Sequence, residues 1–497
     1  MSSPALPGVR RVPLLLAVFA TGVPMFMASL DNLVMTNALP VIHTELGASV
    51  EELQWFINAY TLVFASVILL AVALGDRFGR RTVFAIGIGV FTLASVAAAL
   101  STDPAGLIVA RAVQGLGGAA IMPLSLSLLA GSVDERRRPL AIGIWGGVAG
   151  LGVAAGPLIG GAVVEGWNWQ AIFWINVPVG LLAIPLILAV LPNAFGARLR
   201  PDVPGVILAG LGVLGLVFGI VRGNDAGWDS AEVLGGLGAG VVLLTLFVLW
   251  ELRTRSPLLP LRLFRDRSFT LANLVGFGFS FGMFGAVFIL IQFLQVVQGA
   301  SPLEAAVQTT PWTMAPLVVA PIAGALAPRV GTRALIVLGL VLQGVSLLAI
   351  ALVMGPDTPY VVMLPWFITA GVGMALVFAP SSTAVLAHID PHDTAKASGT
   401  NSTLREIGVA LGIAVLTAVF TGAGGELTPT GYVDAAVPAV IVGGAVLLAT
   451  AVVALFLPAG RGRVVADETA EILAGAAEGD EARDERELAP VGPAPAA

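Results

Sequence analysis

The sequence contains no cysteine, and charged residues make up only 11% of its 497 positions. The absence of cysteine excludes disulfide frameworks, thiolate metal sites and cysteine nucleophiles. Soluble domains carry about 25% charged residues, so this chain has less than half of the polar surface that folding in water requires. The 57% hydrophobic content and the mean hydropathy of +0.94 instead indicate a polytopic membrane protein.

Further absences narrow the classes of function. The net charge is −6 and basic residues form no patch of the kind that binds nucleic acid, so we expect no nucleic-acid partner. The chain has no Walker A, HExxH or GxSxG pattern, so ATP hydrolysis and the commonest hydrolase chemistries lack support. We therefore expect that the protein is not an enzyme.

Long apolar runs predict fourteen transmembrane helices, since one membrane span needs about 20 mostly apolar residues. The runs lie near 13–41, 54–74, 82–101, 105–130, 139–164, 170–191, 204–221, 232–252, 269–297, 302–327, 334–354, 359–387, 398–421 and 432–457. They are continuous and do not alternate as the strands of a barrel do. The predicted fold class is therefore an all-α polytopic membrane protein.

Basic residues fall in alternate loops between the predicted helices. Arg77 follows the second helix, Arg136 the fourth and Arg253 the eighth, whereas the opposite loops hold only Arg222 beside several acids. The positive-inside rule then places both termini in the cytoplasm. The chain has one lysine against 24 arginines and is rich in Ala, Gly and Val. That usage indicates a high-GC bacterial genome, so we expect a multi-pass protein of a bacterial cytoplasmic (inner) membrane.

A faint internal repeat predicts two halves. Residues 74–81 and 326–333 share Leu, Arg, Gly and Arg at matching offsets, and many transporter folds are built from such repeats. The predicted units are a cytoplasmic N-terminus (1–12), two six-helix bundles (13–191 and 269–457), a linker (192–268) that holds the seventh and eighth helices as an inserted pair, and a disordered acidic cytoplasmic tail (458–497).

Asp31 and Arg111 stand out among the charged residues inside predicted spans, where a charge costs about 2.5–3.5 kcal/mol. Asp31 lies well inside the first helix, with Met27 and Met35 one turn to either side on the same face. Loss of water disfavours a carboxylate, which suits reversible protonation. We predict a proton or cation site at Asp31; the alternative is a hydrogen bond that only packs helices. Arg111 needs a carboxylate, carbonyls or a water-filled cavity, unless it extends to the membrane interface.

Other candidates carry weaker signals. Arg405 and Glu406 lie in a span or at its cytoplasmic boundary, and the sequence leaves both open. Phe284, Phe288, Gln292 and Gln295 share a helical face that could line a substrate cavity with Met27 and Met35, although such faces more often pack against other helices. His388, Asp390, His392 and Asp393 cluster in a predicted loop, but short patterns of this kind arise by chance, and we predict no metal site.

Three motifs together resemble the fourteen-helix drug:proton antiporters of the major facilitator superfamily. The loop signature after the second helix is matched by Gly75, Asp76, Arg77, Gly79, Arg80 and Arg81. The helix-four motif associated with proton coupling is matched by Arg111, Gln114, Gly115 and Gly117. The antiporter motif of helix five is matched by Gly143, Gly152, Gly156, Pro157 and Gly160. The sequence departs from the family at Asn32, Leu33 and Met35 in helix one, and at Pro328, where the repeat would place an acid.

The resemblance implies a major facilitator fold that exports a lipophilic drug or antibiotic by alternating access. In this account Asp31 exchanges a proton against substrate, Arg111 biases that exchange, and Asp76 with its neighbouring arginines locks the cytoplasmic side in one state. The proton gradient drives transport, so no cofactor is expected, and the fold implies a monomer. The alternatives are an importer or metabolite exporter with the same fold, or a membrane sensor that transports nothing.

Overall fold

The protein is all-helical over the residues that its computed structural model describes, which are 12–133, 137–196, 202–254, 257, 259–387, 389, 394–429 and 431–458. The helices are α1 (Leu14–Leu46), α2 (Val50–Phe78), α3 (Arg80–Ala99), α4 (Pro104–Ser132), α5 (Arg138–Gly166), α6 (Ala171–Trp174), α7 (Asn176–Val190), α8 (Val203–Ala226), α9 (Ala231–Glu251), α10 (Arg267–Gln292), α11 (Pro302–Val330), α12 (Thr332–Val353), α13 (Tyr360–Leu386), α14 (Thr394–Gly422) and α15 (Tyr432–Leu455). A 3₁₀ turn (Leu261–Arg265) precedes α10 and a π-helical turn (Phe293–Val297) follows it.

The structure has as many long helices as the sequence predicts transmembrane helices, while the crossing of the membrane by all fourteen stays a prediction. The four-residue α6 and the adjoining α7 form one broken span, Ala171–Val190, so the described part of the chain has fourteen long helices. Twelve helices in that part are long and apolar enough to cross a membrane, and α5 and α11 are outside this group. The fold is that of a polytopic, all-α membrane protein, as its sequence predicts.

Polar caps extend several helices beyond the apolar runs that predict them. The Ser49 side chain accepts a hydrogen bond from the Glu52 backbone N–H, and the Glu52 side chain accepts one from the Ser49 backbone N–H. This capping box starts α2 at Val50, before the predicted 54, because it satisfies backbone donors that the first turn leaves free. The helix α1 likewise runs on to Leu46 and ends at Gly47, whose φ of 62° suits glycine.

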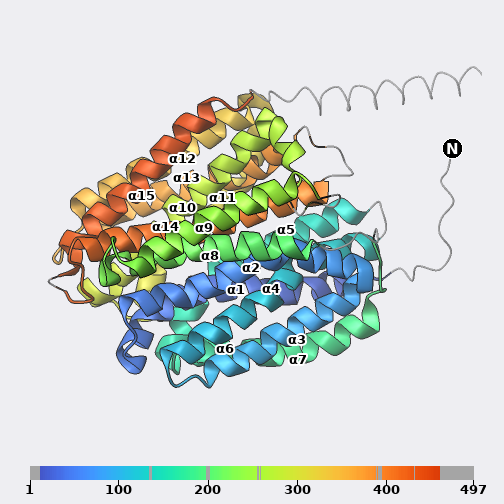
Figure 1. Ribbon diagram of the computed structural model, residues 1–497, viewed down its shortest axis with the longest axis horizontal. Helices are drawn as coiled ribbons and strands as arrows, with labels where there is room; N and C mark the ends of the chain where they lie inside the picture. Colours follow the sequence, from blue (N-terminus) through green and yellow to red (C-terminus); the bar gives the residue numbers. More distant parts are fainter. Residues whose placement is uncertain are drawn as a thin grey trace, which may run out of the picture.

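The helices form two groups that lie side by side (Figure 1). In the first group α1 packs on α5, α2 on α4, and α3 on α4 and α7; in the second α10 packs on α14 and α15, α12 on α13 and α15, and α11 on α13. The groups meet where α5 contacts α11 and α2 contacts α14. The helices α8 and α9 pack on each other, and α8 also contacts α2 and α14. The residue boundaries of two six-helix domains stay a prediction.

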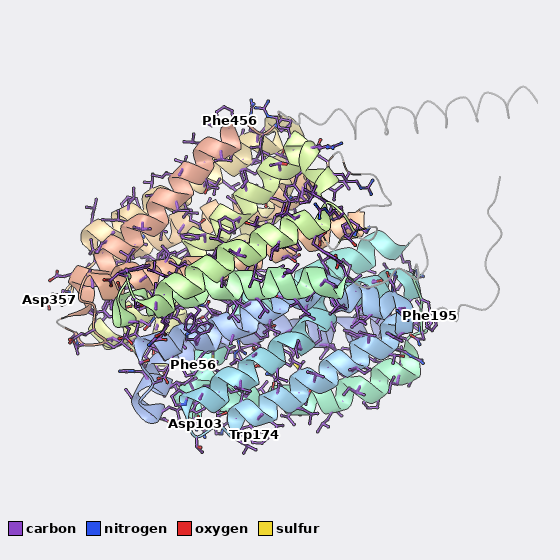
Figure 2. The ribbon with its side chains drawn as sticks, in the orientation of Figure 1. Phe56, Asp103, Trp174, Phe195, Asp357 and Phe456 are labelled. Carbon is purple, nitrogen blue, oxygen red and sulfur yellow. The ribbon has the colours of Figure 1, made fainter. Side chains whose placement is uncertain are left out.

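The two ends of the helix bundle differ in charge. Phe195 and Phe456 lie at one end, and Asp103, Trp174 and Asp357 lie at the other (Figure 2). The first end, which we call the basic end, carries Arg77, Arg80, Arg81 and Arg333. The second end, which we call the acidic end, carries Glu51, Asp103, Glu165, Asp225, Glu232, Glu304 and Asp357. This is the alternation that the loops predict; which end faces the cytoplasm stays a prediction.

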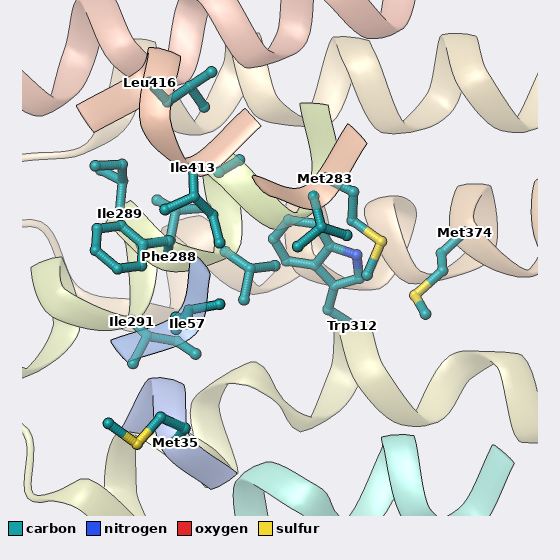
Figure 3. Packing of buried hydrophobic residues seen from close by; sticks show 14 of the residues in the cluster. Met35, Ile57, Met283, Phe288, Ile289, Ile291, Trp312, Met374, Ile413 and Leu416 are labelled. Carbon is teal, nitrogen blue, oxygen red and sulfur yellow. The ribbon is translucent and has the colours of Figure 1, made fainter. Parts of the chain in front are cut away.

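One apolar cluster crosses the boundary between the groups. It joins Met35 of α1 and Ile57 of α2 to Phe288 of α10, Trp312 of α11 and Ile413 of α14 (Figure 3). All five side chains are at most 3% exposed. The two groups therefore share a closely packed core in this conformation.

Candidate functional site

The two intramembrane charges predicted from the sequence form an ion pair. Nη1 of Arg111 lies 2.5 Å from Oδ2 of Asp31, and the two residues are 0% and 5% exposed. Arg111 lies seven residues into α4, about 10 Å along the helix from the acidic end. Because its side chain is fully buried, Arg111 does not extend to a membrane interface, and that alternative is wrong.

Amide side chains complete the surroundings of the Asp31 carboxylate. Oδ1 of Asp31 accepts hydrogen bonds from Nε2 of Gln114 (2.8 Å) and from Nδ2 of Asn176 (3.1 Å). The same two amide groups also donate to Oγ of Ser95, at 3.1 and 3.2 Å. Asp31 on α1 is thus connected to α4, α7 and α3.

Aromatic rings and a backbone carbonyl surround the Arg111 guanidinium. Nε donates to the carbonyl oxygen of Phe56 at 2.9 Å, and Nη1 donates to Oε1 of Gln114 at 2.7 Å. The guanidinium carbon lies 4.5 Å from the centre of the Tyr60 ring and 6.0 Å from that of Phe173, within the range of cation–π attraction. Nη2 is buried and makes no hydrogen bond. The two N–H groups of this nitrogen are therefore without a partner in this structure.

The helix-four motif places the ion pair through close helix packing. Arg111 and Gln114 are three residues apart, so their side chains lie on one face of α4. A Cβ on Gly115 would lie 2.5 Å from the carbonyl oxygen of Tyr60 in α2, and one on Gly117 would lie 2.6 Å from that of Gly87 in α3. Both glycines permit contacts with backbone that no larger residue allows. The two polar residues bind Asp31, and the two glycines hold α4 close enough for this.

The glycines of α5 form the surface on which α1 packs. A Cβ on Gly152 would lie 2.9 Å from Cβ of Ser29, and one on Gly160 would lie 2.9 Å from Cα of Val34. Gly156 faces Leu33 in the same way, at 3.0 Å. The α1 residues in these contacts lie on both sides of Asp31 in the sequence. Nδ2 of Asn37 also donates to the carbonyl oxygen of Pro157 at 2.8 Å. The remaining motif residue, Gly143, lies in the first part of α5.

The loop signature lies at the basic end and binds within its own group of helices. Nε of Arg80 lies 2.7 Å from Oδ1 of Asp76, and the Asp76 carbonyl accepts from the backbone N–H of Gly196 at 3.0 Å. Nη1 of Arg81 donates to two carbonyl oxygens, those of Leu188 and Leu191, at 3.0 Å each. Among the described residues no ion pair joins this loop to the second group. The predicted lock between the halves stays a prediction.

The other residues of the loop signature form the turn between α2 and α3. The guanidinium of Arg77 lies 5.3 Å from the centre of the Phe78 ring. Gly79, which separates α2 from α3, has a φ of 102°, a conformation that residues with a side chain rarely adopt. The same glycine faces the side chain of Asn193, which accepts from the backbone N–H of Arg81 at 3.2 Å. Gly75 faces Leu124 of α4. The signature residues thus form a tight turn braced by the segment after α7.

The residues proposed for a substrate cavity are only partly brought together. Met35 and Phe288 belong to the shared core, with Phe284 packed against it, whereas Met27 packs with Tyr60 and Phe64 in a separate cluster. Nε2 of Gln292 donates to the Phe288 carbonyl oxygen at 2.9 Å. Gln295 lies in the π-helical turn Phe293–Val297, where the residue spacing differs from that of an α-helix, and the shared face stays a prediction. Its Nε2 donates to the Asn37 carbonyl oxygen at 3.0 Å.

A partly buried acid in α14, Glu406, was left undecided by the sequence. Glu406 lies twelve residues after the start of α14 at Thr394, about 18 Å along the helix. Its Oε2 is buried and makes no hydrogen bond. The guanidinium of the adjacent Arg405 lies 4.1 Å from the centre of the Phe378 ring. The sequence signal for a position inside the helix was that the predicted helix continues on both sides of Arg405 and Glu406.

No metal centre is found in the part of the chain that the structure covers, where no three His, Asp or Glu side chains come together in a suitable group. The cluster of His388, Asp390, His392 and Asp393 lies outside the described residues. So do Arg136, the N-terminal residues before 12 and the acidic tail from 459 onward.

Solved transporter structures share the fold of this chain. A peptide transporter, POT, in complex with sulfate aligns with a TM-score of 0.64, 18% identity and coverage of 89% of this chain and 96% of the other. The nucleoside transporter NupG (D323A mutant) aligns with a TM-score of 0.62, 13% identity and coverage of 89% and 99%. At these identities the likeness concerns the fold alone.

Curated relatives are similar in sequence over most of the chain. The "Tetracenomycin C resistance and export protein" of Streptomyces glaucescens is 35% identical over 87% of this chain and 80% of its own length. The "Multidrug resistance protein Stp" of Mycobacterium tuberculosis is 35% identical over 82% and 75%. The "Methylenomycin A resistance protein" of Bacillus subtilis is 33% identical over 91% and 96%. Residues 21–413 also match the family described as the Major Facilitator Superfamily. The chain belongs to the Major Facilitator Superfamily of membrane transporters and is not an enzyme.

Proposed function

We propose that this protein exports a lipophilic drug or antibiotic across the cytoplasmic membrane of a bacterium in exchange for protons. The relatives named above are called resistance or export proteins, which supports a transporter of the drug-efflux type. The single structural observation that carries proton coupling is the buried pair of Asp31 and Arg111. Both termini would lie in the cytoplasm, at the basic end, and the protein would work as a monomer without a cofactor.

Proton coupling would act through the charge of Asp31. A proton on this carboxyl removes the negative charge that holds Arg111, and it weakens the hydrogen bonds that Gln114 and Asn176 donate to it. The link from α1 to α4 and α7 then loosens. The helix α1 packs on the glycines of α5, and α5 contacts α11 of the second group. A displacement of α1 would thus reach the boundary between the two groups.

The gradient is sufficient to drive export. One elementary charge that moves through 100 mV is worth about 2.3 kcal/mol. Since about 1.4 kcal/mol corresponds to a factor of ten, one proton supports roughly fiftyfold accumulation of substrate on the other side.

Reconstituted protein tests this proposal. Purified protein in liposomes, loaded with a lipophilic fluorescent drug, should move the drug when a pH gradient is imposed and should stop when an ionophore dissipates it. A drug-susceptibility panel in an efflux-deficient host would supply candidate substrates. If the drug moves equally fast without a gradient, or does not move at all for every compound that the protein protects against, proton-driven export is wrong.

A further inference from the structure

The helices α8 and α9 lie outside the two groups, and their position suggests a function. The helix α8 packs against both groups at once, because Val213, Val217 and Val221 share a cluster with Leu62 of α2 and with Ala410 and Ala414 of α14. The helix α9 contacts α8 and exposes most of its other side. Figure 1 shows the pair running along the outside of the bundle. The pair therefore covers the line along which α2 meets α14.

At the acidic end, Arg222 of α8 holds the first group. Its Nη1 lies 3.1 Å from Oε2 of Glu51 at the start of α2. The same Nη1 lies 3.1 Å from Oδ2 of Asp225 on α8 itself, and Nε lies 2.7 Å from Oε1 of Glu232 on α9. Of these three ion pairs, only the one with Glu51 leaves the α8–α9 pair. The other two fix the orientation of the arginine.

The opposite face of the same turn of α8 holds the second group. Nδ2 of Asn224 donates to the carbonyl oxygen of Ala418 at 2.5 Å and to Oγ1 of Thr421 at 2.7 Å, both in α14. Nε1 of Trp228, which follows α8, donates to Oδ1 of Asn224 at 2.9 Å and orients the amide. Two residues apart on α8, Arg222 and Asn224 thus bind opposite sides of the boundary between the groups.

We infer that the tip of the α8–α9 pair is a clasp that holds the acidic ends of α2 and α14 together. Any motion that separates the two groups at this end must break the contact of Arg222 with Glu51 or that of Asn224 with α14. The clasp stabilises the conformation that is closed at the acidic end, and Arg222 and Asn224 are its positioning residues. The inference rests on the proposed function only in requiring that the two groups separate at this end during transport.

The two ion pairs of Nη1 offer a matched comparison. Glu51→Gln and Asp225→Asn each remove one carboxylate charge at the same distance, 3.1 Å, from the same atom. Glu51→Gln removes the ion pair between the α8–α9 pair and α2, whereas Asp225→Asn leaves that ion pair in place. Asn224→Ala removes the tie to α14. Partly exposed ion pairs contribute modestly, so we expect Glu51→Gln to change the ratio of open to closed acidic ends by about two- to fivefold.

Distance measurements between spin labels test the clasp directly. Because the natural chain has no cysteine, introduced cysteines are the sole labelling sites. Thr102→Cys with Asp357→Cys reports on the acidic end, and Phe195→Cys with Phe456→Cys reports on the basic end; all four are exposed, and Figure 2 shows three of them at their ends together with Asp103, the neighbour of Thr102. We expect Glu51→Gln and Asn224→Ala to lengthen the acidic-end distances and shorten the basic-end distances, and Asp225→Asn to leave both unchanged.

The outcomes separate the clasp from the transport proposal. Equal shifts in Glu51→Gln and Asp225→Asn, or no shift in Glu51→Gln and Asn224→Ala, would overturn the clasp. These measurements need no transported substrate, so they stand even if the drug is unknown. If instead the unmodified chain holds one fixed set of distances at every pH and with every drug tested, alternating access itself fails and the proposed function falls with it. Elution as a single monodisperse species shows that each variant is folded.

Discussion

Asp31 and Arg111 neutralise each other at a buried position between α1 and α4. Their ion pair of 2.5 Å joins α1 to α4, and Arg111 is 0% exposed. Replacing one partner of such a pair leaves an uncompensated buried charge, which is far more costly than replacing both. The stability of the fold and the proposed proton coupling thus depend on the same ion pair.

The first prediction concerns stability. Arg111→Gln should lower the free energy of unfolding by about 3–5 kcal/mol, because the Asp31 carboxylate then stays buried without its cation. The double variant Asp31→Asn with Arg111→Gln should recover most of that loss, while transport remains absent. Thermal unfolding in detergent measures both. A double variant as unstable as the single one would show that the guanidinium serves mainly through its packing on Tyr60 and Phe173.

The second prediction concerns the glycines of α5. Gly160→Ala should reduce transport strongly, because the new Cβ would lie 2.9 Å from Cα of Val34, which is backbone and cannot rotate away. Gly147→Ala in the same helix is the control, since nothing lies within 4 Å of the position of its Cβ. Initial rates of drug uptake into inside-out vesicles, normalised to expression, compare the two. Similar rates for both variants would mean that the contact of α5 with α1 does not matter for the cycle.

The third prediction concerns the partly buried acid of α14. Glu406→Gln should raise the free energy of unfolding by about 1–3 kcal/mol, because a charged group whose buried oxygen lacks a hydrogen bond costs more than a neutral amide in the same place. Glu426→Gln, at an exposed position after α14, should change nothing measurable. The comparison uses unfolding temperatures at fixed pH. If Glu406→Gln destabilises the protein instead, the carboxylate has a stabilising role that its surroundings do not reveal.

Much of the architecture could be predicted from the sequence because long apolar runs and loop arginines are local signals. The physical cost of a buried charge also predicted that Arg111 needs a partner. The identity of that partner could not be predicted, since Asp31 is 80 residues away in the chain and Asn176 is a further 65 residues beyond Arg111. These contacts depend on how four helices pack, and no periodicity within one helix encodes that.

Two other features show the same limit. The sequence predicts one regular helix over 269–297, whereas a π-helical turn begins after Gln292. The contact of Asn224 with Thr421 spans 197 residues and joins an inserted helix to the second group. In both cases the local composition is ordinary and gives no signal of the feature.

The measurement that tests the central claim most directly is proton-driven drug efflux by Asp31→Asn in proteoliposomes. Proteoliposomes with the unmodified protein should accumulate a lipophilic drug under an imposed pH gradient. Proteoliposomes that contain the same amount of Asp31→Asn should not accumulate it. The amide is close in size to the carboxyl and cannot take up a proton in exchange. Undiminished gradient-driven transport by Asp31→Asn would contradict the assignment of Asp31 as the proton carrier.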